Sequence, residues 1–354
     1  MSFHFRIIPR LLHFKQPAGT SRGIYTTRKI WLLELTADEM PGRKGIGECA
    51  PLPDLSCDAS PDYEQTLKEM CRNMELTGTI DYDLLRPYPS ILFGMETALL
   101  HLQRGTTSLS DTPFARGEEG IPINGLVWMG SFDEMLGRLE EKMKAGFRCV
   151  KLKIGAIDFE KELELIRHIR RHFSKDEIEL RVDANGGFSP DDALDKLNRL
   201  AQYDIHSIEQ PIKQHQWDVM AALCAASPLP IALDEELIGV NDTAQKALLL
   251  NTIRPAYIIL KPSLHGGMHG SREWIDMAKK RGIGSWITSA LESNIGLNAI
   301  AHFTALTYGS HITMPQGLGT GALFTNNIEM SLEIRGDQLW FCPAQQAFSD
   351  TFEV

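Results

Sequence analysis

Five short apolar runs of this chain each end at one ionisable residue. These residues are Lys153, Asp183, Glu209, Asp234 and Lys261, and they follow one another at intervals of 30, 26, 25 and 27 residues. One strand, one helix and two short loops occupy an interval of that length, so the recurrence predicts repeated βα units. Such units form a parallel barrel whose strands end at one rim, where barrel enzymes build their active sites. The sequence therefore predicts a barrel with a charged rim.

The phase of each strand can be checked, because side chains alternate between the two faces of a strand. In VKLKI, Lys151 and Lys153 share one face, and the apolar residues share the other, which we expect to pack on outer helices. Helical patterns separate the strands, as at 158–173 and 190–202. The expected strands are PINGLV (122–127), CVKLKIG (149–155), IELRVDAN (178–185), SIEQPI (207–212), IALDE (231–235), YIILKP (257–262), GSWITSA (284–290) and HITMPQ (311–316).

The chain outside the barrel has a different rhythm. We expect antiparallel strands at 3–9, 29–37 and 45–51, with a polar, glycine-bearing loop at 15–27, and then helices at 63–76 and 91–103. A last hairpin, at 330–341, should return to this first part. The predicted organisation is an α/β protein with an α+β part at 1–118, a (β/α) barrel at 119–316 and a returning C-terminal segment at 317–354.

Charge and composition restrict the partners of the protein. Its 354 residues include 46 acidic and 36 basic ones, a formal net charge of -10, and no dense basic run that could neutralise a phosphate backbone. Nucleic acid is therefore not an expected partner. The first residues, MSFHFRIIPR, are not a secretory signal, and no run is long enough to cross a membrane, so we expect a cytoplasmic protein. Six cysteines without a CxxC pair favour reduced thiols.

Three carboxylates from successive strands are a candidate metal site. Asp183, Glu209 and Asp234 offer oxygen ligands, which hard divalent ions prefer, and three carboxylates leave positions open for water and substrate. This set suits Mg²⁺, with Mn²⁺ as an alternative ion. The competing interpretation is that each acid is a strand-end residue paired with a lysine.

The lysines on either side of the carboxylates are candidates for acid–base chemistry. Lys153 becomes a credible base if a nearby positive charge disfavours its protonation, and both Lys151 and a bound dication would do so. A lysine beside a metal-bound carboxylate is suited to removing the proton on the adjacent carbon. The alternative is that Lys151 and Lys153 only neutralise buried acids.

These motifs resemble the enolase superfamily, in its branch related to muconate lactonising enzyme. KLKIG matches the KxK motif of that branch, VDANGG, IEQP and LDE match its three metal ligands, and LKP matches the lysine of its sixth strand. The resemblance implies a modified (β/α) barrel with an α+β capping domain built from both termini. It also implies Lys153 and Lys261 as catalytic residues, with Asn185 and Glu235 supporting the ligands.

Further segments resemble the o-succinylbenzoate synthase family of menaquinone biosynthesis. That resemblance implies a small carboxylate substrate, 2-succinyl-6-hydroxy-2,4-cyclohexadiene-1-carboxylate, which is dehydrated to 2-succinylbenzoate. Lys153 would move the proton and Lys261 would stabilise the anion. Lys151, Arg22, Ser289 and Leu291 would contact substrate. The matching segments are 17–23, 47–56, 123–130, 288–297 and 316–324.

Two alternatives remain open from the sequence. One is an N-acylamino acid racemase or dipeptide epimerase of the same superfamily, although MPQGLGTG at 314–321 lacks the Asp-x-Asp motif that holds a dipeptide ammonium. The other is a non-catalytic binding protein that kept the fold. The oligomeric state is left open.

Overall fold

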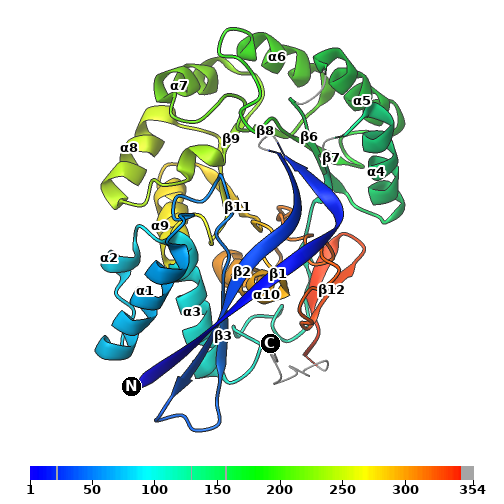
Figure 1. Cartoon of the computed structure of the whole chain (residues 1–354). Coiled ribbons are helices and arrows are strands. Elements are labelled where there is room, and N and C mark those ends of the chain that lie inside the picture. Colours follow the sequence, from blue (N-terminus) through cyan, green and yellow to red (C-terminus); the bar gives the residue numbers. More distant parts are fainter. Residues whose placement is uncertain (21–22, 129, 156–157, 344–354) are drawn as a thin grey trace.

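The computed structural model describes residues 1–20, 23–128, 130–155 and 158–343, with the backbone alone at 19, 20 and 23. The chain begins with an antiparallel sheet in the order β1-β2-β3, which we call the capping sheet. Its β1–β2 hairpin extends over the barrel, as Figure 1 shows. The strands are β1 (Phe3–Thr20), β2 (Gly23–Ala37) and β3 (Gly45–Cys49).

The prediction of a loop at 15–27 is wrong, because most of this stretch extends β1 and β2. Backbone pairing within a hairpin needs no apolar face, so a polar composition does not prevent it. The register between the two strands shifts between His13 and Ala18. At this bulge the backbone N–H of Lys15 donates to the carbonyl of Leu323, at 2.8 Å. The C-terminal segment therefore fixes the bulge of the hairpin.

Three helices pack against the capping sheet: α1 (Tyr63–Thr77), α2 (Tyr82–Leu85) and α3 (Pro89–Arg104). The predicted helices at 63–76 and 91–103 are confirmed as α1 and α3. Helix α3 approaches β3 so closely that a Cβ on Gly47 would overlap the carbonyl of Gly94, and a Cβ on Gly94 would overlap Cys49. The two glycines therefore permit this contact.

Seven parallel strands form the barrel sheet, in the order β11-β10-β9-β8-β7-β6-β5. Each strand pairs with its predecessor in the chain, as repeated βα units require. The predicted α/β class with a (β/α) barrel is confirmed. The strands are β5 (Gly125–Val127), β6 (Cys149–Lys153), β7 (Glu179–Asp183), β8 (Ser207–Glu209), β9 (Ile231–Leu233), β10 (Tyr257–Leu260) and β11 (Gly284–Ile287).

Helices surround this sheet on its outer side (Figure 1). Several begin at a side chain that accepts a hydrogen bond from the first turn, as Asp158 does from the N–H of Glu160 at 3.0 Å. None of the described helices combines the length and apolar character that crossing a membrane requires. The helices are α4 (Phe132–Lys144), α5 (Phe159–His172), α6 (Ala193–Leu200) with η1 (Ala201–Tyr203), α7 (Trp217–Ala226), η2 (Glu235–Leu237), α8 (Thr243–Ile253), α9 (Gly267–Lys279) and α10 (Asn294–Tyr308).

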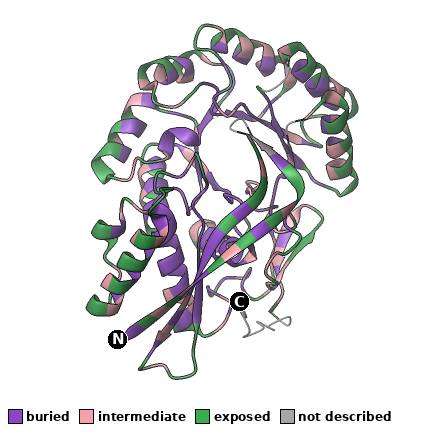
Figure 2. Ribbon diagram, in the orientation of Figure 1, coloured by how far each residue is buried: buried purple, intermediate pink, exposed green. Residues whose placement is uncertain are grey.

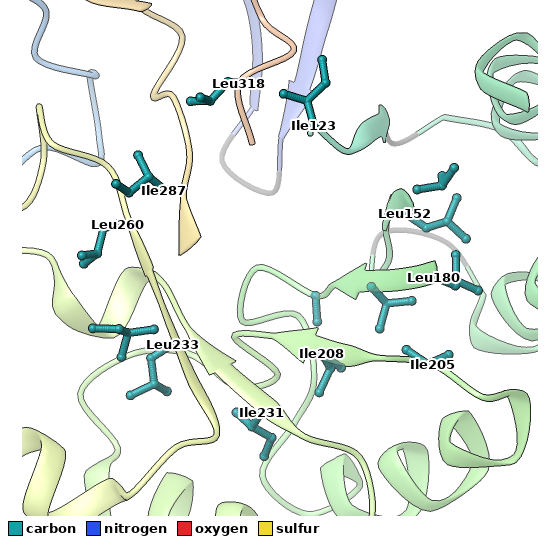
Figure 3. Packing of buried hydrophobic residues seen from close by; sticks show 14 of the residues in the cluster. Ile123, Leu152, Leu180, Ile205, Ile208, Ile231, Leu233, Leu260, Ile287 and Leu318 are labelled. Carbon is teal, nitrogen blue, oxygen red and sulfur yellow. The ribbon is translucent and has the colours of Figure 1, made fainter. Parts of the chain in front are cut away.

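The apolar face of each barrel strand packs outward, as its phase predicted. Leu152, Leu180, Ile208 and Leu233 belong to one buried cluster that also contains Ile166 of α5 and other helix residues. Figure 3 shows these strand residues on successive strands of the barrel. Because the outer face is apolar, the polar residues that alternate with it point inward. The packing therefore places the charged residues inside the barrel.

The eighth strand, predicted at 311–316, is wrong in extent. Only Gln316 and Gly317 pair, as single bridges to Ile123 and Thr288. The N–H of Gln316 donates to Pro122, and that of Gly317 donates to Ile287, each at 2.8 Å. These two residues thus join the edges of the seven-stranded sheet. Pro315, immediately before them, has no N–H to extend the pairing.

The C-terminal hairpin is confirmed, but its neighbour differs from the prediction. Strands β12 (Leu332–Arg335) and β13 (Gln338–Phe341) pair around Gly336 and Asp337, and β13 pairs with β4 (Ile121–Pro122) at the start of the barrel. The preceding stretch contacts the capping sheet, where Phe324 bridges Phe14 of β1. The domain boundaries at 118 and 316 stay a prediction.

Two buried carboxylates fix the capping part to the barrel helices. Glu48 of β3 accepts hydrogen bonds from the N–H groups of Ser293 and Gly296, both at 2.9 Å, at the start of α10. Glu96 of α3 accepts from Met268 and His269 of α9, at 2.6 and 3.0 Å. Helix N-termini favour negative charge. Figure 2 shows that much of α3 and α10 is buried at this junction.

Candidate active site

The five residues that the sequence singled out meet at the C-terminal end of the barrel sheet. Lys153, Asp183 and Glu209 are the last residues of β6, β7 and β8, and each pairs directly with the next across neighbouring strands. Asp234 directly follows β9, and Lys261 directly follows β10. We call these five residues, together with Lys151, the rim cluster. The predicted register is therefore confirmed.

Two lysines of β6 share the same carboxylate oxygen. Lys153 Nζ lies 2.9 Å from Asp183 Oδ2, and Lys151 Nζ lies 3.3 Å from that oxygen. Lys151 also donates to Glu209 Oε2 at 2.8 Å. Asp183 is completely buried, so these lysines supply most of its neutralisation. The geometry brings a second positive charge close to Lys153, as the sequence predicted.

The ionisation of this part of the cluster follows from these contacts. Burial raises the pKa of Glu209 well above its ordinary value, and the Asp183 carboxylate raises it further. Although burial opposes it, the ammonium groups of Lys153 and Lys151 lower the pKa of Asp183. Burial also opposes the shift of Lys151, whose pKa is raised by Glu209 and Asp183. Lys151 is thus held as a cation and is better suited to supply charge than to accept a proton.

The second lysine site lies on the other side of the carboxylates. Lys261 Nζ forms an ion pair with Asp234 Oδ2. Burial would lower the pKa of Lys261, but the carboxylates of Asp234 and Glu235 raise it. The backbone N–H of Lys261 also donates to His265 Nδ1 at 2.8 Å, which fixes the turn after β10. Lys261 is therefore a cation at the end of a fixed strand.

The carboxylates fit a hard divalent ion in their chemistry. Glu209 Oε1 and Asp234 Oδ1 are buried and have no hydrogen-bond partner in the part of the chain that the structure describes. Unpaired buried oxygens are costly, and oxygen is the ligand atom that Mg²⁺ prefers. Among the described residues, however, no group of three or more His, Cys, Asp or Glu side chains is arranged to hold an ion as it stands. Binding an ion would require the carboxylates to exchange their lysine partners for it.

A shell of amides and acids holds the cluster. Lys153 donates to Asn185 Oδ1 at 2.6 Å, and Asn185 donates to Glu235 Oε1 at 3.0 Å, so both predicted supporting residues contact the site. Gln210 was not predicted. Its side-chain oxygen accepts from the N–H of Asp234 at 3.3 Å, and it is fully buried. Its position directly after Glu209 is the one signal that could have identified it.

The rim cluster forms the floor of a cavity of roughly 470 Å³. The capping sheet contributes Phe14, Ala18 and Tyr25 to the lining, so its hairpin forms one wall. Ser289 and Leu291, both predicted as substrate contacts, lie in the opposite part of the lining after β11. The fourth predicted contact besides Lys151, Arg22, lies outside the described residues.

Comparisons with known proteins agree with this architecture. The family model described as "MenC, N-terminal domain" matches residues 21–102, and the one described as "Enolase C-terminal domain-like" matches 134–325. The o-succinylbenzoate synthase of Desulfotalea psychrophila is 47% identical over 360 aligned positions, which cover 93% of this chain and 96% of that protein. The chain belongs to the o-succinylbenzoate synthase family. The family resemblance drawn from the motifs is confirmed.

Solved structures extend this likeness to the fold. The crystal structure of MenC from Desulfotalea psychrophila has a TM-score of 0.82 at 42% identity, covering 96% of this chain and all of that chain, 100%. A dipeptide epimerase from Enterococcus faecalis, complexed with Mg and the dipeptide L-Leu-L-Tyr, has a TM-score of 0.81 at 20% identity and 97% coverage of both chains. The second likeness concerns the fold alone.

Proposed function

We propose that this o-succinylbenzoate synthase family member dehydrates 2-succinyl-6-hydroxy-2,4-cyclohexadiene-1-carboxylate to 2-succinylbenzoate, as a metal-dependent hydro-lyase. One observation carries the proposal. In a chain that belongs to this family, two lysines approach three buried carboxylates from both sides at the floor of one cavity. Acid–base groups and a charge-stabilising group are thus available at one place, which loss of water next to a carboxylate requires.

In this proposal Lys153 removes the proton on the carbon that bears the substrate carboxylate. It then returns the proton to the hydroxyl group that leaves from the same face as water. Asn185, which accepts from Lys153 at 2.6 Å, orients the amine. Lys151, held as a cation 3.3 Å from the same Asp183 oxygen, disfavours a second positive charge on Lys153. A ligand that takes over Asp183 Oδ2 would leave Lys153 without its counter-ion and favour the neutral amine.

Lys261 would stabilise the anion between the two proton transfers. Its pairing with Asp234 supports a permanently cationic group, which suits electrostatic stabilisation better than proton abstraction. A cation over the face of the ring would add a cation–π contact. A racemase needs bases on both faces, so a cationic Lys261 argues for the dehydration.

Asp183, Glu209 and Asp234 are the residues that would hold Mg²⁺, or Mn²⁺ in its place. Their unpaired buried oxygens and the Mg in the Enterococcus faecalis epimerase support this assignment. When bound, the ion would stabilise the negative charge that develops on the substrate carboxylate. Asn185 and Glu235 would then orient ligands and lysine together.

The wall opposite the lysines favours this substrate over a dipeptide. The segment after the barrel closure lines the cavity with Gly317, Gly319 and Thr320 and contributes no carboxylate to the lining within the described chain. A dipeptide ammonium would lack a partner there, and burying it unpaired is costly. A small molecule without an amine fits better. Six free thiols agree with the cytoplasmic location that we propose.

The test is a direct assay of 2-succinylbenzoate formation, run beside racemisation of an N-acylamino acid with the same enzyme and Mg²⁺. We expect dehydration to be the faster reaction by a large factor in kcat/KM. Racemisation without measurable dehydration would overturn the proposal and favour the racemase. Absence of both reactions in folded, Mg²⁺-loaded protein would favour a binding protein.

A further inference from the structure

Arg28 is a buried arginine at the base of the hairpin that covers the cavity. It lies in β2, three residues after Tyr25, which lines the cavity, and its cross-strand partner is Leu12. Only 2% of its surface is exposed. None of the ion pairs found among the described residues involves it, so its guanidinium is not bound to one acid.

The guanidinium instead binds four backbone carbonyls from two parts of the chain. Nη1 donates to Pro51 at 2.7 Å and Nη2 to Ala50 at 2.5 Å, both just after β3 of the capping sheet. Nη2 and Nε also donate to Ala290 and Leu291, at 3.3 and 3.4 Å, just after β11 of the barrel. A planar fork of donors fixes the positions of several acceptors at once. Arg28 therefore links the capping sheet to the wall of the cavity.

That wall has an unfavourable backbone conformation that needs support. Leu291 has φ of 65°, in the left-handed region that a side chain with a Cβ disfavours. Its N–H donates to Ser289 Oγ at 3.1 Å. The N–H of Ala290 donates to Glu292 at 2.7 Å, and Glu292 also accepts from Ser263, two residues after Lys261. Such conformations persist only where their surroundings over-determine them.

We infer that Arg28 is a positioning residue that sets the Ser289–Leu291 wall against the substrate, and so governs substrate affinity rather than proton transfer. This inference rests on the proposed function. Arg28 contacts none of the lysines or carboxylates of the rim cluster in the described structure, but it holds two carbonyls of the wall that faces them. Loss of the guanidinium would free these carbonyls and let the left-handed turn relax. The wall would then no longer fit the substrate.

Arg86 provides a matched control for mere attachment of the capping part. It also joins the two parts, donating to Asn241 at 2.9 Å and pairing with Glu273 of α9 at 3.2 Å. It is absent from the cavity lining. Replacing Arg86 therefore weakens the junction without touching the wall. If Arg28 only attached the capping part, the two replacements would act alike.

The experiment compares Arg28→Met, Arg28→Lys and Arg86→Met in the Mg²⁺-loaded enzyme. It measures KM, kcat, the pH profile of kcat and the unfolding midpoint. For Arg28→Met we expect KM to rise about tenfold or more, with kcat reduced less than about threefold and its pH profile unchanged. Arg28→Lys should restore part of the affinity, and Arg86→Met should keep KM within about twofold of the wild type.

The inference is overturned if Arg28→Met leaves KM unchanged, or if both arginine replacements raise KM equally. If Arg28→Met does not fold, Arg28→Lys decides, and an unchanged KM in that variant overturns the inference. Failure of the proposed function is distinguishable, because it would appear as a wild type that forms no 2-succinylbenzoate.

Discussion

Lys153→Met tests the assignment of the base. A positioned general base or acid typically contributes a factor of about 10² to 10⁴ to the rate. Lys153 is proposed to act in both roles, so we expect kcat to fall by about 10⁴-fold, equal to about 5.4 kcal/mol of activation free energy. The assay is steady-state formation of 2-succinylbenzoate with saturating Mg²⁺.

The structure also sets the expected effect of Lys153→Met on stability. The variant loses two hydrogen bonds, to Asp183 at 2.9 Å and Asn185 at 2.6 Å. Asp183 still has Lys151 at 3.3 Å and the N–H of Asn185 at 3.0 Å. The free energy of unfolding should therefore fall by about 1–3 kcal/mol rather than the about 3–5 kcal/mol of a buried charge left alone. The variant should stay folded, so its lost activity would reflect chemistry.

Lys246→Met is the matched control, because Lys246 is a buried lysine outside the cavity that pairs with Glu273 at 2.7 Å. We expect comparable destabilisation with kcat within about twofold of the wild type. A Lys153→Met enzyme that keeps more than about a tenth of the wild-type kcat would refute the assignment, because another group would then move the proton.

Three further predictions concern the metal, the pH dependence and the core. Exhaustive chelation should abolish turnover and Mg²⁺ should restore it, and Asp234→Asn should weaken Mg²⁺ binding in calorimetry by about tenfold or more, whereas Asp58→Asn, at a buried acid elsewhere, should not; equal affinities would contradict the ligand assignment. Burial raises the pKa of Glu96 from 4.5 to about 8, so the folded protein holds this proton at pH values where the unfolded chain has lost it. Stability should therefore fall as the pH rises from about 5 to about 8, by up to about 1.4 kcal/mol per unit, and Glu96→Gln should flatten the fall in a denaturant series; parallel curves would count against it. Leu152→Ala should cost about 2–5 kcal/mol in chemical denaturation, because it removes a fully buried side chain from the outer core; a loss below about 1 kcal/mol would contradict that packing.

Local pattern was sufficient to predict the barrel and the composition of its rim. The alternation within VKLKI fixes which residues face inward, and parallel strands in a barrel bring their ends together whatever lies between them. Lys153, Asp183 and Glu209 therefore became neighbours by register alone. The apolar partners of these residues in the strands carried the matching information for the outer core.

Features that depend on distant contacts were not predictable in the same way. The eighth strand is only Gln316 and Gly317, because it is defined by the two sheet edges that it joins rather than by its own pattern. The hairpin at 15–27 is polar yet paired. Arg28 contacts Leu291, 263 positions away in the chain, and no local signal in the sequence marks such a pair.

The most direct test of the account is a crystal structure of the protein with Mg²⁺ and 2-succinylbenzoate. We predict one ion bound by Asp183, Glu209, Asp234 and the carboxylate of the product, with Lys153 released from Asp183 and directed at the ring carbon that bears this carboxylate. An ion bound elsewhere, or Lys153 still paired with Asp183 and turned from the ring, would contradict the account.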